Sequence, residues 1–530
     1  MAQRVERAIS GRRIRFSASG FHIPKKGRIR IVLCIVVCVV GMRVLIHKEA
    51  PHSAIVKQPV KSMPLVGPPA PPVPRSQAEN KAAAPKQESK QLHTSEPEPD
   101  AASAPHQETP VAHETPSGQQ PPHQSLFSRL GLFSKPEIPR HDFTGSDVAE
   151  LLKKHPANPG TVLDSFVADN KRYVVHYSID SCVQHTGENL LKQYHPKYGA
   201  LVAMDCKTGR VLALVSYNRP TEPQLGNDLY VKSIFPAASV FKTITAAAAI
   251  EKAGLGPDSK LQLTGRRYTL YKFQLKQDLA VSEPVTLEQA YAFSMNPIFG
   301  RIGVYIIGTS GLKEYIDKFG FNSAIPFDLE NENAHAQVNA NDSLMAVAEI
   351  ASGFNQKTRM SPLFGAMLAS GVSENGKMPV PFFVDSITCG GGDSCTLYRS
   401  RSRTWRTPIK ANTAACIKSM MMRVAQYGTA RSSFKYIKHS AMFDNIDYGG
   451  KTGTIDEDKL GKIDWFIGFA SHPTNQNQRI AVGVVTVHDQ YWTVHSSYIA
   501  AEIFRKYIRR EQTEEKENRL ASPNRLKPVG

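Results

Sequence analysis

The stretch Pro236-Ala-Ala-Ser239-Val-Phe-Lys242-Thr-Ile-Thr-Ala-Ala-Ala-Ala-Ile-Glu-Lys-Ala-Gly254 consists almost entirely of small and apolar residues. Proline in the first turn and glycine just past the end are typical of a helix, so the pattern predicts one helix over 236–254. Because its polar side chains are few, we expect this helix to be central and buried. Ser239 and Lys242 stand three residues apart and therefore share one face of its first turns.

That pair of residues suggests nucleophilic chemistry. A serine hydroxyl is a poor nucleophile unless a base takes its proton, and a lysine can be that base only if its pKa, normally ~10.4, is lowered. Burial and neighbouring positive charge lower it, and an apolar helix near its positive N-terminal end supplies both conditions. The spacing alone is weak evidence, since Ser310 and Lys313 repeat it.

A second motif, Ser294-Met-Asn296, follows a helix that is predicted to begin at Thr286. Gln289 stands three residues after Thr286, which is the reciprocal position of a capping box. Pro297 disfavours helical backbone at the residue before it. Ser294 and Asn296 are therefore expected in a tight corner between two helices, with their polar ends free to face a cleft.

A third motif is Gly449-Gly-Lys451-Thr-Gly-Thr454, where glycines would keep a strand bare so that substrate backbone can lie against it. Further strand-like runs precede and follow a mostly helical stretch over 236–425, and a helical pattern closes the domain near residue 508. We therefore predict an α+β fold, in which an antiparallel sheet is assembled from both ends of the domain around a large, mostly helical insertion. The strand-like runs cover residues 173–179, 199–204, 211–216, 464–470 and 480–487.

The three motifs come in an order and spacing, 55 and then 157 residues, that resembles the penicillin-recognising acyl-serine transferases with their SxxK, SxN and KTG motifs. Other segments look like transpeptidase domains of penicillin-binding proteins, and the resemblance covers roughly residues 143 to 510. It implies a transpeptidase or serine β-lactamase-like fold. These segments are Ser178-Ile-Asp180, Gln184, residues 203–213, Ser361-Pro-Leu363, Gly428-Thr-Ala430 and residues 464–468.

The resemblance also implies roles for the catalytic residues. Ser239 would attack the carbonyl of a D-Ala-D-Ala peptide bond, release D-Ala and form an acyl-enzyme, with neutral Lys242 as general base. Ser294 would relay the proton to the leaving amine, supported by Lys451. β-Lactams would acylate the same serine because they mimic the substrate.

Substrate binding is implied for Asn296 and for Thr452-Gly453-Thr454. Asn296 would hold the substrate amide, the two threonines would bind the terminal carboxylate, and the backbone N–H groups of Ser239 and Thr454 would hold the developing oxyanion. No cofactor and no metal is expected, because the seventeen histidines show no pair at a metal-ligand spacing such as HExxH.

The N-terminal part predicts membrane attachment. Residues 1–30 carry nine basic residues against one acidic residue, and the apolar segment 31–46 is predicted to be a single transmembrane helix, interrupted only by Arg43. The positive-inside rule places the N-terminus in the cytoplasm and the catalytic domain outside the bacterial inner membrane, in the periplasm. A cleaved signal peptide is the alternative, but the sequence after 43 lacks a small-x-small cleavage pattern. This topology explains much of the net charge of +18, so nucleic-acid binding is not expected.

The remaining boundaries follow from composition. Residues 47–140 are rich in Pro, Ala, Gln, Glu and Ser and are predicted to be a disordered linker, followed by a transpeptidase domain over 141–510 and a charged tail over 511–530. Cys389 and Cys395 flank a glycine-rich turn and could close a disulfide loop in an oxidising compartment.

Several functional alternatives stay open. Because neither a glycosyltransferase nor a pedestal domain precedes the transpeptidase region, a separate glycan polymerase is the expected partner, besides peptidoglycan stem peptides, β-lactams and the membrane. A D,D-carboxypeptidase or endopeptidase would differ only in letting water deacylate Ser239. A class D β-lactamase would have Val where this chain has Asn296. A β-lactam sensor or scaffold that is acylated and stalls is the non-enzymatic alternative.

Overall fold

The computed structural model describes residues 144–521, apart from 157–159, 169–170, 279–281 and 390–395. The predicted cytoplasmic segment, transmembrane helix and linker lie outside the described residues. Within the part described, no helix combines the length and the apolar character that crossing a bilayer requires.

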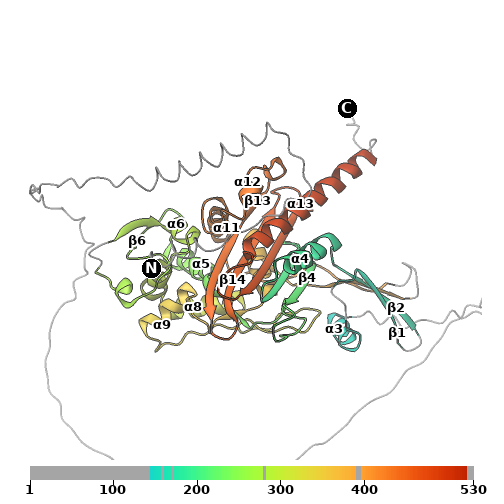
Figure 1. Cartoon of the computed structure of the whole chain (residues 1–530), viewed down its shortest axis with the longest axis horizontal. Coiled ribbons are helices and arrows are strands. Elements are labelled where there is room, and N and C mark those ends of the chain that lie inside the picture. The colour runs from blue at the N-terminus through green and yellow to red at the C-terminus, as the bar shows by residue number, and fades with distance from the viewer. Residues whose placement is uncertain (1–143, 157–159, 169–170, 279–281, 390–395, 522–530) are drawn as a thin grey trace, which may run out of the picture. The chain divides into compact units, whose positions relative to one another are not determined.

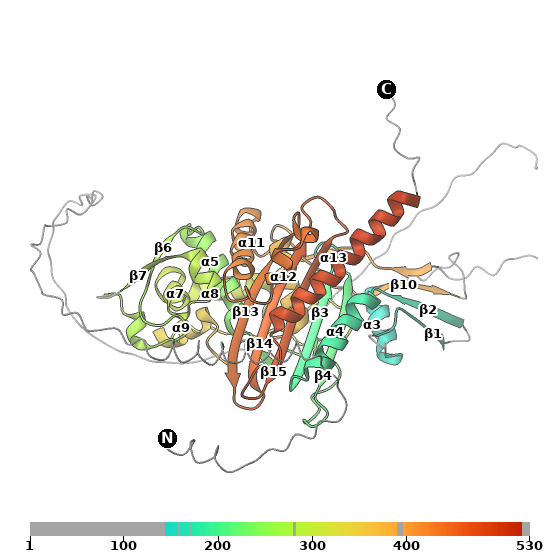
Figure 2. The same ribbon diagram turned by 45° about the horizontal axis from the view of Figure 1, so that its top comes forward.

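A five-stranded antiparallel sheet forms the centre of the domain, with the strand order β13-β14-β15-β3-β4 (Figure 2). Two of its strands precede the helical insertion and three follow it, which confirms the predicted assembly from both ends. β13 is an edge strand, so one side of its backbone is free of sheet pairing. The strands are β3 (Tyr198–Met204), β4 (Val211–Asn218), β13 (Asp447–Glu457), β14 (Gly461–Ser471) and β15 (Arg479–His488).

Helices cover both faces of this sheet. α4 (Ser181–Tyr194) and α13 (Ser496–Ala521) pack together on one face (Figures 1 and 2). α10 (Pro362–Ser373) and α11 (Ala411–Gln426) contact the other face. Because both faces are covered, β3 is buried along its whole length. Its sequence is therefore a continuous run of mostly apolar residues rather than an alternation of apolar and polar residues.

The insertion contains the buried helix α5 (Lys242–Ala253), which ends at Gly254 in a left-handed conformation, as predicted. Its predicted first turn is instead a separate 3₁₀ turn, η3 (Ala238–Phe241). The other helical elements of the insertion are η4 (Lys272–Leu275), α6 (Leu287–Ala292), α7 (Asn296–Arg301), η5 (Ile302–Ile307), α8 (Gly308–Phe319) and α9 (Leu344–Ser352), and its short strands are β5 (Phe235–Pro236), β6 (Lys260–Leu263), β7 (Glu283–Thr286), β8 (Arg359–Met360), β9 (Met378–Pro379) and β12 (Thr404–Arg406).

The predicted strand over 173–179 is not part of the central sheet. It forms β2 (Lys171–Tyr177), which pairs with β1 (Leu163–Ala168) on one side and β10 (Val384–Cys389) on the other, and β11 (Thr396–Arg399) completes this second sheet. The chain leaves β2 at Ser178 and enters α4 through its N-cap Asp180, so it does not continue into the central sheet beside β4. The helix α3 (Gly145–Lys154) precedes β1.

The predicted boundary at residue 510 falls inside α13. Glu515 accepts hydrogen bonds from Asn475 and Gln478, and Gln512 donates to the backbone oxygen of Met442. Residues 511–521 therefore continue the last helix instead of forming a separate tail. Two short elements between α11 and β13, α12 (Lys435–Lys438) and η6 (Ala441–Phe443), complete the described fold.

Cys389 is disulfide-bonded, whereas its predicted partner Cys395 lies outside the described residues. Cys182, Cys206 and Cys416 are free thiols, and Cys206 is buried.

Gly353 and Gly254 have nearly equal φ angles but different surroundings. Substituting each of them tests whether packing against Gly353 holds the η3 turn at Ala238 in place. Gly353 ends α9 with φ of +67°, and a Cβ there would lie 1.9 Å from the backbone oxygen of Ala238, whereas Gly254 has φ of +65° and open space around it. Gly254→Ala should cost only the left-handed backbone penalty, about 1–2 kcal/mol. Gly353→Ala should destabilise the domain more and displace the turn that carries Ser239.

Thermal unfolding and acylation by labelled penicillin check this prediction. We expect Gly353→Ala to slow acylation by about 100-fold, because small displacements of reacting groups are that costly, and Gly254→Ala to leave the rate within about twofold. Equal acylation rates in the two variants would contradict the inferred role of this contact.

Candidate active site

The structure brings the three predicted motifs together at one point. Ser239 lies on η3, and Lys242 is the first residue of α5. Ser294 lies between α6 and α7, Asn296 is the first residue of α7, and Lys451 lies on the edge strand β13. Segments separated by up to 157 residues are thereby joined by direct side-chain hydrogen bonds.

Lys242 is fully buried, and its amine contacts three oxygen atoms. Nζ lies 2.7 Å from Ser239 Oγ, 2.7 Å from Asn296 Oδ1 and 2.6 Å from the backbone oxygen of Ser352. All three contacts are to uncharged groups. A buried ammonium with no opposite charge beside it is costly, so the site favours the neutral amine.

The hydrogen-bond partners of Lys242 also determine where the lone pair of its neutral amine points. A neutral amine has two N–H donors and one lone pair. The Asn296 and Ser352 oxygens can only accept hydrogen bonds, so they take the two N–H groups, and the lone pair is left facing Ser239, the one contact that can donate. Lys242 is therefore oriented to accept the hydroxyl proton of Ser239.

Burial acts on both lysines of the site. It lowers the pKa of Lys242 well below its ordinary value, and the nearby positive charge of Lys451 lowers it further. Burial lowers the pKa of Lys451 to about 7. The predicted condition for a lysine base, a depressed pKa, is met by the arrangement of the fold.

Ser294 occupies the corner between α6 and α7, as predicted. The capping box of Thr286 and Gln289 begins α6, and Ser294 follows its end with φ of +56°, a conformation that is unusual for serine. Its Oγ lies 2.9 Å from Lys451 Nζ, which also donates to the backbone oxygen of Thr452. A positive φ at a serine is strained and persists only where neighbouring groups hold it. Here the contact of Ser294 with Lys451 on β13 does so.

Asn296 has a different surrounding from the one predicted. Its Oδ1 accepts from Lys242, and its Nδ2 donates to the backbone oxygen of Tyr268 at 2.9 Å. Because only one amide N–H remains for a substrate, the direct effect of Asn296 in this structure is to hold the amine of Lys242 in place.

On β13, Gly453 lets the strand approach η3, since a Cβ at Gly453 would lie 3.3 Å from the backbone nitrogen of Ser239. The hydroxyl of Thr452 lies 2.5 Å from that of Thr429, and the hydroxyl of Thr454 donates to Asp464 at 3.2 Å. Both threonines predicted to bind a carboxylate are thus already hydrogen-bonded to neighbouring side chains.

Sequence reasoning did not assign several groups of the site. Thr429 and Asp464 lie in segments that contribute to the family resemblance, which was a usable signal. Ser352 and Tyr268 contribute only backbone oxygens, and because any residue type has one, the sequence holds no signal for them.

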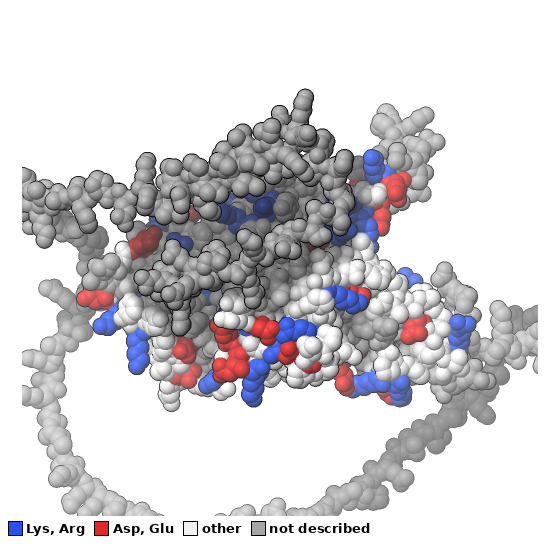
Figure 3. Space-filling view, viewed as in Figure 1, with Lys and Arg blue, Asp and Glu red and all other residues white. Residues whose placement is uncertain are grey.

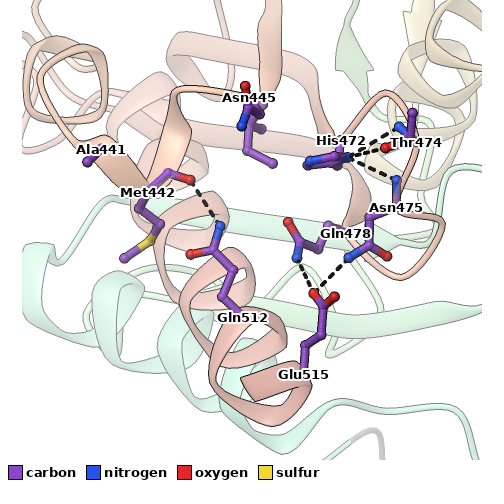
Figure 4. Close-up of a pocket in the computed structure, with 10 residues that line it drawn as sticks. Ala441, Met442, Asn445, His472, Thr474, Asn475, Gln478, Gln512 and Glu515 are labelled. Carbon is purple, nitrogen blue, oxygen red and sulfur yellow. Dashed lines mark hydrogen bonds between the residues drawn. The ribbon is translucent and has the colours of Figure 1, made fainter. Parts of the chain in front are cut away.

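A polar cavity of about 440 Å³ lies elsewhere in the domain, between η6, the β14–β15 turn and α13 (Figure 4). Figure 4 shows Glu515 joined to Asn475 and Gln478 on one side of it. None of the predicted catalytic residues lines this cavity, so it is separate from the site described above.

Comparison with known proteins agrees with this geometry. Residues 199–509 match the family model for the penicillin binding protein transpeptidase domain. The chain therefore belongs to the penicillin-binding protein transpeptidase family. Residues 144–198, with α3, β1, β2 and α4, precede the matched range.

Two curated relatives illustrate the level of sequence similarity. The chain is 24% identical over 323 residues to the peptidoglycan D,D-transpeptidase PbpA of Mycolicibacterium smegmatis, covering 55% of this chain and 62% of the relative. It is 26% identical over 329 residues to the stage V sporulation protein D of Bacillus subtilis, covering 56% of this chain and 47% of the relative. The chain thus spans about half to three fifths of these relatives.

Solved structures show the same fold. The D,D-transpeptidase domain of a peptidoglycan glycosyltransferase from Eggerthella lenta aligns with a TM-score of 0.52 and 22% identity, over 64% of this chain and 84% of that one. PBPA from Mycobacterium tuberculosis aligns with a TM-score of 0.51 and 22% identity, over 63% and 81%.

Removal of the amine tests the role of Lys242. Lys242→Met keeps a long side chain but has no base, and acylation by labelled penicillin should fall by about 100-fold or more. Lys252→Met is the matched control, because Lys252 lies at the other end of α5 and pairs with Glu314. Normal acylation in Lys242→Met would mean that another group takes the proton.

The pH dependence of acylation gives a second test. Only neutral Lys242 can accept a proton, so the rate should rise with pH as this amine loses its proton. Since the pKa of Lys242 is well below 10.5, the rise should be complete before that pH is reached. A rate that still rises through pH 10.5, measured with labelled penicillin over pH 5 to 11, would show an unperturbed lysine.

Proposed function

We propose that the chain is a serine D,D-transpeptidase that cross-links peptidoglycan stem peptides through an acyl-enzyme on Ser239 and is acylated by β-lactams at the same residue. The observation that carries the proposal is the buried Lys242 amine, with its lone pair directed at the hydroxyl of Ser239. Membership of the transpeptidase family and the names of the relatives support it.

In the acylation step, Ser239 Oγ attacks the carbonyl carbon of the D-Ala-D-Ala bond while Lys242 accepts its proton. The peptide C–N bond breaks as the leaving amine of D-Ala takes a proton. Ser294 is the group placed to deliver it, because its hydroxyl lies 2.9 Å from Lys451, whose pKa of about 7 lets it give and take a proton near neutral pH.

The backbone N–H groups of Ser239 and Thr454 are the proposed oxyanion donors. The close approach of Gly453 to the Ser239 nitrogen supports this assignment, because it brings β13 beside η3. In deacylation, an amine of a second stem peptide attacks the ester carbonyl and gives up a proton to the Ser294–Lys451 pair, which supplied one to the departing D-Ala. The ester C–O bond then breaks, and Ser239 Oγ takes back its proton from Lys242.

We further propose that residues 31–46 anchor the chain in the bacterial inner membrane, with the catalytic domain in the periplasm, and that a separate polymerase supplies the glycan. One solved structure with a TM-score of 0.50 and 17% identity is described as structural coordination of polymerization and crosslinking by a peptidoglycan synthase complex. On the part of the face that Figure 3 leaves uncovered, basic and acidic side chains lie close to one another.

Incubation of the purified protein with a stem pentapeptide and an amine acceptor, followed by mass spectrometry, tests the proposal. We expect a cross-linked product that has lost one D-Ala and gained the acceptor. A trimmed tetrapeptide alone would indicate a carboxypeptidase, and a permanently acylated protein without product would indicate a sensor or scaffold. Either of these outcomes would contradict transpeptidation.

A further inference from the structure

One loop of the insertion lies directly beside the catalytic groups. Residues 264–276, here called the active-site loop, follow β6 and include η4. The backbone oxygens of Arg267 and Tyr268 accept hydrogen bonds from Asn296, at 2.7 Å from its backbone nitrogen and 2.9 Å from Nδ2. Arg267 also lies 4.9 Å from the ring centre of Phe293, the residue before Ser294.

The active-site loop is held by an internal network. Gln274 is buried, donates to the backbone oxygens of Thr264 and Arg266, and accepts from the backbone nitrogen of Tyr271. Gly265 makes the turn with φ of +72°. Because the backbone is fixed, the side chains on the outside of the loop are presented at defined positions, which lowers the entropy cost of binding.

The loop carries four basic residues and no acidic residue. Arg266 and Arg267 are both exposed, and neither forms an ion pair within the part of the chain that the structure describes. On the nearby helix α11, by contrast, Arg423 is paired with Glu288. The active-site loop therefore presents unneutralised positive charge next to the catalytic residues.

Exposed aromatic side chains accompany this charge. Tyr268 is 60% exposed, and Tyr271 and Phe273 stack on each other with their ring centres 5.9 Å apart while remaining about half exposed. Aromatic residues together with arginine are the side chains that contribute most to binding surfaces. Their presence on a fixed loop indicates a surface that receives a ligand.

We propose that the active-site loop recognises a carboxylate on the peptide that Ser239 attacks. Arg267 binds this carboxylate through its planar guanidinium, and Tyr268 packs against the apolar part of the peptide. The inference rests on the proposed function and adds a specificity-determining residue, Arg267, for a carboxylate of the donor peptide. Since the same loop positions Asn296, and Asn296 positions Lys242, a peptide bound there lies beside the base.

Two matched peptides test this inference. Both end in D-Ala-D-Ala, and they differ in carrying either a glutamate or a glutamine upstream. The readout is the kcat/KM for release of D-Ala, divided by each variant's penicillin acylation rate to correct for any change in the catalytic groups. Arg267→Glu should lower this value about 10- to 100-fold for the acidic peptide and by less than about threefold for the amidated one.

Arg267→Gln should give an intermediate loss with the same preference, and it introduces no negative charge beside Phe293. Arg401→Glu is the control for a change of charge elsewhere, because Arg401 is an exposed residue just after β11 in the second sheet. An equal loss for both peptides in Arg267→Glu, no loss at all, or the same selective loss in Arg401→Glu would overturn the proposal.

Failure of the proposed function would be recognised separately. If the wild-type protein releases D-Ala from neither peptide, each peptide is tested as a competitor of penicillin acylation instead. Stronger competition by the acidic peptide, lost in Arg267→Glu, would support recognition by the active-site loop without turnover. Equal or absent competition by the two peptides would overturn it.

Discussion

The site depends on the burial of one amine. Lys242 lies inside the domain with three uncharged oxygen partners, and this environment makes its neutral form the favoured one. Each partner comes from a different part of the insertion: the η3 turn, the start of α7 and the end of α9. The proposed chemistry therefore depends on the packing of these elements, since moving any of them would expose the amine to water or change its hydrogen-bond partners.

Other features of the fold hold η3, the turn that carries Ser239, against the central sheet. Trp465, which is fully buried on β14, donates to the backbone oxygen of Pro236 at 2.8 Å. On the other side, the close contact of Gly353 with Ala238 leaves no room for a side chain. Ala238 and Ser294 both have positive φ. The strained backbone at Ala238 is held by the close approach of Gly353, and that at Ser294 by its contact with Lys451 on β13.

Much of this could be predicted from the sequence, because the motifs carry their own local signals. The Ala-rich run predicted a buried helix, Thr286 and Gln289 predicted the start of α6, and the outer strands predicted a sheet built from both ends. The membership of β2 in a second sheet was missed because its pairing partners β1 and β10 were not among the strand-like runs recognised in the sequence. The extension of α13 past residue 510 was missed because its charged residues resemble a solvated tail, whereas Glu515 and Gln512 contact the domain.

The central claim is that Ser239 is the residue that forms the acyl-enzyme. Intact-protein mass spectrometry after exposure to penicillin, followed by peptide mapping, tests it most directly. The structure predicts one adduct per chain, located on the peptide that contains Ser239, and no adduct in Ser239→Ala. Undiminished labelling of Ser239→Ala, or an adduct on another residue, would contradict it.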